Sequence, residues 1–487
     1  MFVGIDIGTT SVKSVLMSED GVLQASASFP VAVSRPRAGW SEQDPEDWWA
    51  AVCDTLDALK AAEPRLMASV RGIGLSGHMH GATLLGEGYA VLRPAILWND
   101  GRAAAECLEI EAECPEARSI TGNIVMPGFT APKLAWVRRH EPAIFDRVKK
   151  VLLPKDYIRL KLTGDYASDM SDASGTCWLD VGARRWSDAL LAVTGLDRSH
   201  MPDLYEGTEA TGHLREALRV RFGMDQAPVV AGGAGDNAAS ACGIGAVTPG
   251  SAFLSLGTSG VLFVSNDRFS PNTEGAVHAF CHALPETWHQ MGVILSATDS
   301  LNWFARLVGA PAAELTAALG DSVSKPSPAL FMPYLSGERT PHNDAGARGG
   351  FLGLDQTSSR QDLTQAVLEG VAFAFRDCLR VLQDAGTEVT RAFAVGGGAN
   401  SPVWLSIMAS VLDRPLDVSQ TADVGAALGA ARLGQAAATG ASDPAALMPP
   451  PPVHRTIEPD PTLARAYAER YERYRALYAA SAHAAEA

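Results

Sequence analysis

Two short segments, about half of the 487-residue chain apart, share one layout, and this repeat constrains the fold more than any other feature. The first, near the N-terminus, reads GIDIGTTSVKSVLMSEDG, and the second, near the midpoint, reads AFLSLGTSGVLFVSND. Each is a β-rich run, a Gly-Thr turn and a second apolar run, so that Gly8 and Thr9 correspond to Gly257 and Thr258. The repeat predicts two halves that each open with a β-hairpin, although turns of small residues are common enough for one such pair to arise by chance.

A chain of this length exceeds what one hydrophobic core usually organises, so we expect two domains, residues 1–244 and 245–487. In the first, Asp44 and Pro45 precede apolar residues at helical spacing, which indicates a capped helix. In the second, AFAVGGGANSPVW reads as a strand, a triple-glycine turn and a helix that starts near Ser401. Strand and helix signals in both halves predict α/β domains.

Charge balance and cysteine content narrow the class of protein. Forty basic and 55 acidic side chains give a formal net charge of -15, which disfavours nucleic acid as a partner. Seven scattered cysteines without a CxxC pair, and an N-terminus with no basic residue before Lys13, predict a cytoplasmic protein with reduced thiols. A charge-free stretch, residues 237–266, contains Pro249 and many Gly, Ser and Thr residues. We expect buried turns and strands there, and no membrane contact.

One glycine motif is a decoy. GIGLSG, residues 72–77, matches the GxGxxG fingerprint of dinucleotide-binding proteins, with Asp100 further along the chain. That fingerprint must follow a strand and open a helix, whereas these glycines lie inside the expected strand and no helical pattern follows. A Walker A loop is also absent, since the dipeptide Gly-Lys does not occur. Neither a nicotinamide or flavin site nor a P-loop is therefore expected.

The paired Gly-Thr turns allow another kind of phosphate site. Backbone N–H groups and threonine hydroxyls in two tight turns can hold an anion from two sides. Asp6, beside the first turn, is a hard oxygen ligand suited to Mg²⁺ near phosphates. A third glycine turn, residues 396–398, lets a nucleoside approach the backbone closely. The alternative is that these are ordinary hairpins with solvated turns, but their pairing favours a nucleotide held between two halves.

Asp236 is the single charged residue of AGGAGDNAAS, where a strand gives way to a helix. An aspartate at such a junction can cap the helix and stabilise it by about 1 kcal/mol. It can also serve as a positioned base that takes a proton from a substrate hydroxyl. The local sequence leaves both roles open.

Several longer segments resemble the FGGY carbohydrate kinase family, which has the actin-like ATPase (ribonuclease H-like) fold of two α/β domains with a cleft between them. GFTAPKLAWVRRH (residues 128–140) and GGFLGLDQTSSRQDLTQAVLE (residues 349–369) fit two long family signatures. Supporting matches run along nearly the whole chain, namely IDIGTTSVK, GWSEQDPEDWW, WNDGR, SDASGT, YLSGERTPHND and GGGANS. The resemblance implies an ATP- and Mg²⁺-dependent sugar kinase, with the sugar on the N-terminal domain and the nucleotide on the C-terminal domain.

The resemblance also implies site residues. Asp236 is the expected general base with Asp6 as its catalytic partner and metal ligand, and Asn237 is a substrate contact. GHMHG is similar to a family segment, GQMHG, that contacts xylulose, so Met79 and His80 are expected sugar ligands. These matches imply phosphorylation of D-xylulose to D-xylulose 5-phosphate. His78 replaces the usual glutamine, which keeps a related ketose or polyol open, and a non-enzymatic ATP-binding module of this fold is the third alternative.

The expected ATP contacts come from three turns and are residues Gly8, Thr9, Thr10, Lys13, Gly257, Thr258, Gly397, Gly398 and Asn400. Lys13 fits either a phosphate contact or a solvated strand position. Asp169 and Asp172, in the family-like segment SDMSDASGT, fit turn-forming aspartates, and no catalytic role follows for them. A homodimer is expected from the resemblance alone.

Overall fold

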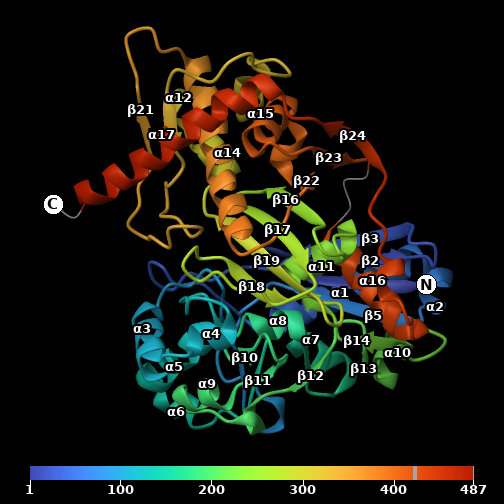
Figure 1. Ribbon diagram of the computed structural model, residues 1–487. Coiled ribbons are helices and arrows are strands. Elements are labelled where there is room, and N and C mark those ends of the chain that lie inside the picture. Colours follow the sequence, from blue (N-terminus) through green and yellow to red (C-terminus); the bar gives the residue numbers. More distant parts are fainter. Residues whose placement is uncertain (421–424, 486–487) are drawn as a thin grey trace.

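The computed structural model describes residues 1–420 and 425–485, and each half of the molecule contains a seven-stranded mixed sheet (Figure 1). The first sheet has the order β13-β14-β5-β1-β2-β3, with β15 also paired to β5. Its strands are β1 (Phe2–Ile7), β2 (Ser11–Met17), β3 (Leu23–Pro30), β5 (Gly72–Gly77), β13 (Ala210–His213), β14 (Val229–Ala231) and β15 (Ala234–Gly235). The second sheet has the order β18-β19-β17-β16-β22-β23-β24. Its strands are β16 (Ala252–Leu256), β17 (Gly260–Asn266), β18 (His278–Cys281), β19 (Trp288–Ile294), β22 (Ala392–Val395), β23 (Leu416–Ser419) and β24 (Val453–Ile457).

The two sheets have the same internal plan. In the first, β3, β2 and β1 form an antiparallel meander, and β5 and β14 continue the sheet parallel to β1. In the second, β19, β17 and β16 form the meander, and β22 and β23 continue it in parallel. Both predicted hairpins, β1–β2 and β16–β17, are present. The predicted duplication and two-domain α/β fold are therefore confirmed, while the division at residue 244 stays a prediction.

Many helices of the first half build the lower part of Figure 1, and some of them pack against the first sheet. The predicted cap is present, because the Asp44 carboxylate accepts the Glu46 N–H at 3.0 Å where α1 begins. The helices are α1 (Pro45–Ala62), α2 (Pro64–Ala68), α3 (Ala104–Glu113), α4 (Ala117–Thr121), α5 (Thr130–His140), α6 (Pro142–Phe145), α7 (Pro154–Thr163), α8 (Met170–Ser174), α9 (Asp188–Val193), α10 (Glu216–Phe222) and α11 (Asp236–Ile244).

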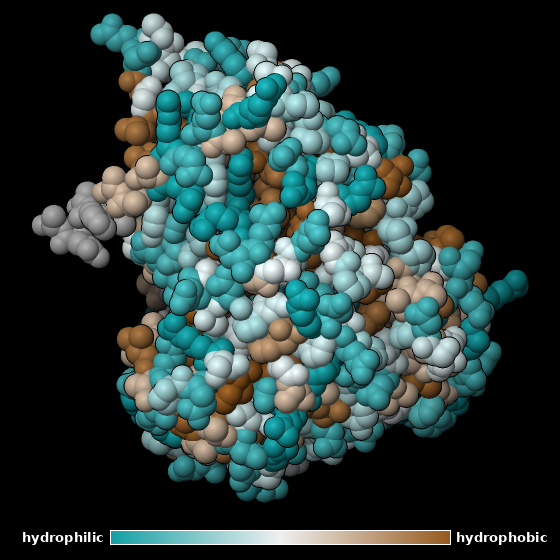
Figure 2. Space-filling view, in the orientation of Figure 1, coloured by the Kyte–Doolittle hydropathy of each residue, from teal (hydrophilic) through white to brown (hydrophobic). Residues whose placement is uncertain are grey.

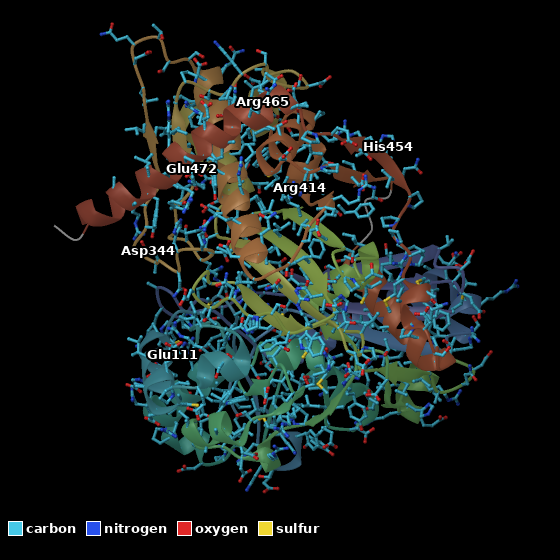
Figure 3. All side chains as sticks on the ribbon, in the orientation of Figure 1. Glu111, Asp344, Arg414, His454, Arg465 and Glu472 are labelled. Carbon is cyan, nitrogen blue, oxygen red and sulfur yellow. The ribbon has the colours of Figure 1, made fainter. Side chains whose placement is uncertain are left out.

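The second half is held together around a long buried helix, α14. The helices are α12 (Thr298–Val308), α13 (Ala312–Ala317), α14 (Arg360–Asp384), α15 (Pro402–Leu412), α16 (Ala426–Thr439) and α17 (Pro461–Ala485). Tyr467 and Tyr471 of α17 are buried and donate to Glu369 and Asp377 of α14. Polar residues of α17 such as Glu472, labelled in Figure 3, lie on its exposed side.

Short strands and 3-10 turns complete the described chain. The strands are β4 (Glu42–Gln43), β6 (Thr83–Leu85), β7 (Ala95–Ile96), β8 (Lys150–Leu152), β9 (Ala167–Asp169), β10 (Leu179–Asp180), β11 (Arg185–Trp186), β12 (Asp203–Tyr205), β20 (Leu330–Met332) and β21 (Gly350–Leu352). The turns are η1 (Glu87–Tyr89), η2 (Arg198–His200), η3 (Gly397–Asn400) and η4 (Pro444–Leu447).

One late helix lies on the early sheet. α16, coloured orange-red in Figure 1, packs against β1, β5 and α11 of the first half. The approach is so close that a Cβ at Gly74 would lie 1.7 Å from the Ala430 carbonyl oxygen, and one at Gly429 would lie 1.8 Å from the Ala239 oxygen. Only glycine fits at such contacts. The chain therefore returns to its first half before it ends in the second.

A shared apolar cluster makes a second contact between the halves. It contains Met79 and Phe129 of the first half together with Phe253, Phe280 and Met291 of the second. Aromatic rings bury large apolar areas, so a cluster of this kind contributes strongly to the packing of the two halves.

The charge-free stretch contains more helix than expected. Residues 252–266 hold the predicted strands β16 and β17, but the stretch begins inside α11. No helix within residues 1–420 and 425–485 combines the length and apolar character needed to cross a bilayer. The face in Figure 2 is mainly hydrophilic, with scattered apolar residues.

Candidate active site

The residues predicted to bind the sugar lie together at the carboxyl ends of central strands of the first sheet. β1, β5 and β15 run parallel, with Asp6 opposite Ser76 and Gly77 opposite Gly235. The carboxyl ends of these strands therefore lie side by side. Asp6 is near the end of β1, Met79 and His80 follow β5, and Asp236 follows β15. Carboxyl ends of parallel strands are where α/β folds usually bind ligands.

Asp236 is the first residue of α11, and it does not cap that helix. The N-cap residue is Gly235, and its helix lacks a side-chain capping bond. Oδ1 of Asp236 instead accepts the backbone N–H of Asn237 at 2.7 Å and its side-chain Nδ2–H at 2.9 Å. Burial, followed by the nearby negative charge of Asp6, raises the pKa of Asp236 to about 7. This carboxyl can accept a proton near neutral pH.

Asn237 was expected to contact the substrate. In this structure its amide group is turned onto the Asp236 carboxylate rather than outward. The amide carbonyl of Asn237 is still an acceptor, and the pair forms one polar unit at the start of α11.

Asp6 offers a hard oxygen ligand at the same strand ends. Its Oδ1 accepts the Ser76 hydroxyl at 2.9 Å, and its side chain is half-buried. Burial raises the pKa of Asp6, while the Ser76 hydrogen bond and the charge of Lys13 oppose that shift. No cluster of three or more metal-ligating side chains occurs among the described residues. Mg²⁺ at kinase sites is held by one or two carboxylates together with phosphates and water, so a single carboxylate in this place fits that ion.

His80 is held in an unusual backbone conformation. Its φ is 71°, in the left-handed region that non-glycine residues rarely adopt. Its carbonyl accepts Thr130 Oγ1–H at 3.1 Å and Lys133 Nζ–H at 3.0 Å. Its ring Nδ1 lies 2.6 Å from the Gly175 oxygen. A carbonyl can only accept, so Nδ1 carries the proton and Nε2 is left as an acceptor.

Burial lowers the pKa of His80 well below its usual value. The ring is therefore neutral near pH 7, and Nε2 can accept a hydrogen bond from a hydroxyl. Residues that position functional groups in such strained conformations are frequent in binding sites.

Met79 and His78 flank His80 differently. Met79 is buried directly against Gly235, the residue before Asp236, because a Cβ at Gly235 would lie 2.9 Å from Met79 Cγ. His78 is 2% exposed and its ring packs edge-on against Trp48 at 5.4 Å. Neither ring nitrogen of His78 has a hydrogen-bond partner among the described residues, and burial lowers its pKa to about 3. The replaced glutamine position thus points into the core beside α1.

The first Gly-Thr turn is braced from its sides. The Thr9 hydroxyl accepts Trp98 Nε1–H at 3.1 Å, and the Thr9 carbonyl accepts Gln43 Nε2–H at 2.7 Å. Thr10 is exposed at the tip, and Lys13 lies opposite Asp6 in the β1–β2 register. These contacts hold the turn next to the strand end that carries Asp6. Trp98, in the family-like segment WNDGR, thereby contacts the first turn.

The second Gly-Thr turn lies next to a cavity of the second half. The Gly257 oxygen accepts both the N–H of Thr298 at 2.9 Å and its hydroxyl at 2.8 Å. Thr298 also lines a cavity of about 620 Å³, together with Gly397, Gly398 and Asn400. Much of the remaining lining is apolar, including Leu301. Cavities of this size and character are typical of sites for nucleosides and other drug-sized ligands.

The predicted residues therefore form two groups. The first group lies at the carboxyl ends of the central strands of the first sheet and contains Asp6, the first turn, Met79, His80, Asp236 and Asn237. The second group contains the other residues predicted to contact ATP, which follow β16 and β22 of the second sheet. GIGLSG forms β5 and opens no helix, as expected of a decoy.

Sequence analysis missed the residues that support the site. Ser76 lies within the decoy motif, and Lys133 lies within a family signature to which no role was attached. Lys133 is fully buried on the inner face of α5, and burial lowers its pKa well below the usual value. A lysine among apolar residues at helical spacing was the available signal, since lysine is rarely buried without a partner.

Comparison with known proteins places the chain in a family. The family model described as the FGGY family of carbohydrate kinases matches with its N-terminal domain over residues 1–243 and with its C-terminal domain over residues 252–438. The chain is 50% identical to a xylulose kinase of Escherichia coli (strain K12), and the match covers 98% of both chains. It is 47% identical to a xylulose kinase of Klebsiella pneumoniae, again over 98% of each chain. The crystal structure of a xyloylose kinase from Brucella ovis has a TM-score of 0.97 and 56% identity, and the match covers 99% of each chain.

Proposed function

The chain belongs to the FGGY family of carbohydrate kinases, and we propose that its reaction is transfer of the γ-phosphoryl group of ATP to the terminal hydroxyl of D-xylulose. The products are ADP and D-xylulose 5-phosphate. The observation that carries this proposal is that Asp236, with its pKa raised to about 7, and His80, with a neutral acceptor nitrogen, both follow the carboxyl ends of parallel strands. The identity to xylulose kinases over nearly the full chain supports the choice of sugar.

In the proposed reaction, Asp236 takes the proton of the terminal sugar hydroxyl as its oxygen attacks the γ-phosphorus. The new O–P bond forms as the bond between that phosphorus and the β,γ-bridging oxygen breaks, and ADP leaves with that oxygen. The base orients the hydroxyl and removes its proton, while positioning and charge stabilisation supply most of the catalysis in phosphoryl transfer. His80 Nε2 accepts a second sugar hydroxyl, Met79 offers an apolar contact, and Asn237 completes the polar wall.

The nucleotide is assigned to the two Gly-Thr turns and the cavity of the second half. Backbone N–H groups and hydroxyls of Gly8, Thr9, Thr10, Gly257 and Thr258, with Lys13, hold the phosphates, and Gly397, Gly398 and Asn400 hold the nucleoside. Asp6 is the proposed ligand of Mg²⁺. When bound, that ion would neutralise charge on the phosphate oxygens.

The test measures ADP release by the purified protein with Mg²⁺-ATP and a panel of ketopentoses, aldoses, polyols and glycerol. D-Xylulose is expected to give the highest kcat/KM. Asp236→Asn, which keeps the side-chain shape, should lower kcat with D-xylulose by about 10²–10⁴-fold, the usual contribution of a general base. ADP binding, measured by calorimetry, should be retained.

A matched control is Asp188→Asn. Asp188 is the first residue of α9, as Asp236 is of α11, and it is exposed and paired with Arg198. If Asp236→Asn acts only by weakening a helix terminus, both variants lose activity equally and the base assignment fails. A better polyol substrate would change the sugar and keep the chemistry. ATP turnover that no sugar stimulates would instead support an ATP-binding module without kinase activity.

Three further parts of the proposal concern the setting of the enzyme. All seven cysteines are buried and unpaired in the structure, which suits a reducing compartment such as the cytoplasm. The negative net charge disfavours nucleic acid as a partner. A homodimer is proposed on the family resemblance, and sedimentation of the purified protein tests it.

A further inference from the structure

The SDMSDASGT segment has no role in the proposed chemistry, yet its acidic residues are completely buried. Asp169 and Asp172 each have 0% exposure. Burial of carboxylates is costly unless cations and hydrogen bonds compensate for the lost water. An arrangement of this kind beside an active site needs a structural reason.

Lys155 supplies part of the compensating charge, and burial raises the pKa of Asp172 well above its usual range. Its Nζ lies 2.7 Å from Asp169 Oδ1 and 3.4 Å from Asp172 Oδ2, and it also pairs with Asp156. All four side chains are fully buried. Asp169 in addition caps α8, because its Oδ2 accepts the N–H of Ser171 at 2.7 Å. The short helix is therefore fixed to a buried ionic cluster.

Ser171 links that cluster to the proposed base. Its hydroxyl donates to Asp169 Oδ2, and its oxygen accepts the backbone N–H of Gly235 at 3.1 Å. Gly235 is the N-cap residue of the helix that begins with Asp236. The hydroxyl is 0% exposed, so water does not compete for either bond. A continuous path of contacts thus runs from Lys155 through Asp169 and Ser171 to the residue before Asp236.

Two neighbouring contacts strengthen the same arrangement. Arg159, also fully buried, donates to the carbonyls of Ala231 and Gly232, which lie a few residues before Asp236. The Gly175 carbonyl at the end of α8 holds the His80 ring. The base and the proposed sugar acceptor are therefore both attached to the short helix α8.

We propose that Ser171 is a positioning residue for Asp236, and that Asp169 and Lys155 hold Ser171 in place. The inference rests on the proposed function of Asp236 as the base. Phosphoryl transfer depends on alignment, so a small displacement of the base lowers kcat more than it weakens substrate binding. The buried aspartates of the segment then act through orientation, without touching the reacting atoms.

Ser171→Ala tests this role, with Ser174→Ala as the matched control. Both serines lie in α8 and are almost fully buried, but the Ser174 hydroxyl donates to Met170 and accepts the Cys281 N–H. Ser171→Ala should lower kcat with D-xylulose about 10- to 100-fold and leave KM for ATP within about twofold. Ser174→Ala should keep kcat within about twofold of the parent. Urea unfolding of both variants measures any shared loss of stability.

A double-variant cycle separates positioning from general damage. Once Asp236→Asn has removed the base, adding Ser171→Ala should change kcat by less than about twofold, because there is no base left to position. Equal kcat losses in Ser171→Ala and Ser174→Ala, an unchanged kcat in Ser171→Ala, or a full additional loss in the double variant would each overturn the inference. If the parent protein has no sugar kinase activity, the proposed function itself fails, which is a distinguishable result.

Discussion

At the scale of single residues, the environment of Asp236 decides its chemistry. Asp236 is half-buried, accepts two hydrogen bonds from Asn237 and faces the charge of Asp6. The hydrogen bonds favour the ionised form, but burial and Asp6 outweigh them, and the pKa rises to about 7. The carboxyl therefore changes its protonation state within the working pH range of an enzyme.

This pKa predicts the acid limb of the activity profile. Asp236 acts as a base only when ionised, so kcat/KM for D-xylulose should fall about tenfold per pH unit as the pH drops below about 7. Initial rates between pH 5.5 and 8.5, in buffers of constant ionic strength, measure the limb. Asp236→Asn should show a flat profile over the same range. A parent profile that is flat down to pH 5.5 would contradict the assignment.

At the scale of secondary-structure elements, glycine contacts fix the position of α16. Backbone atoms of this helix approach β5 and α11 so closely that Cβ atoms at Gly74 and Gly429 would overlap with carbonyl oxygens. α11 carries Asp236 at its start, so α16 supports the helix of the proposed base from behind. Packing at this distance requires that the residue facing the carbonyl oxygen has no Cβ.

Gly429→Ala is expected to loosen this packing. Replacement of glycine by alanine inside a helix gains about 1 kcal/mol in intrinsic propensity, but overlap with the Ala239 carbonyl should cost more. We expect a net loss of about 2 kcal/mol in the free energy of unfolding, measured by urea titration. Gly425→Ala is the control one turn earlier, because a Cβ there meets no atom of residues 1–420 and 425–485 within 4 Å. Equal stability of the two variants would contradict the packing argument.

At the scale of the whole molecule, neutral histidines are buried in and around the region where the halves meet. His278 and His282 come from the second half, and burial lowers their pKa values to about 3 and about 4. His78, in the first half, has a pKa of about 3 for the same reason. Asp236 and Glu338, with pKa values raised by burial to about 7 and about 8, affect stability in the opposite direction. The pH dependence of the free energy of unfolding is the balance of the contributions from both groups.

The sign for the histidines follows from proton binding. Below pH 6.5 the unfolded chain takes up protons on these rings while the folded protein does not, so their stabilising contribution is present above 6.5 and is lost as the pH falls toward 3. His78→Gln removes one such ring. Between pH 7 and 5 this variant should lose about 1–2 kcal/mol less stability in urea titrations than the parent. His213→Gln, at an exposed position, is the control and should follow the parent. An unchanged pH dependence in His78→Gln would contradict the prediction.

Local signals were sufficient for several elements. Gly-Thr turns between apolar runs predicted both hairpins, Asp44 before Pro45 predicted the start of α1, and the triple glycine before Ser401 predicted a strand, a turn and the start of α15. Each of these signals acts within a few residues along the chain. The site residues came from longer motifs and the family they resemble, and local sequence left Asp236 undecided between cap and base.

The sequence by itself determined the repeated α/β plan, the family and the residues expected to carry the chemistry. Only the tertiary structure decided that Gly235 rather than Asp236 occupies the cap position and that α16 returns to the first sheet. It also decided that the Ser171 hydroxyl accepts the N–H of Gly235. The physical reason is range along the chain. Turns, caps and apolar periodicity are set by neighbouring residues, whereas burial, strand register and ionic clusters depend on residues that meet only after the chain has folded.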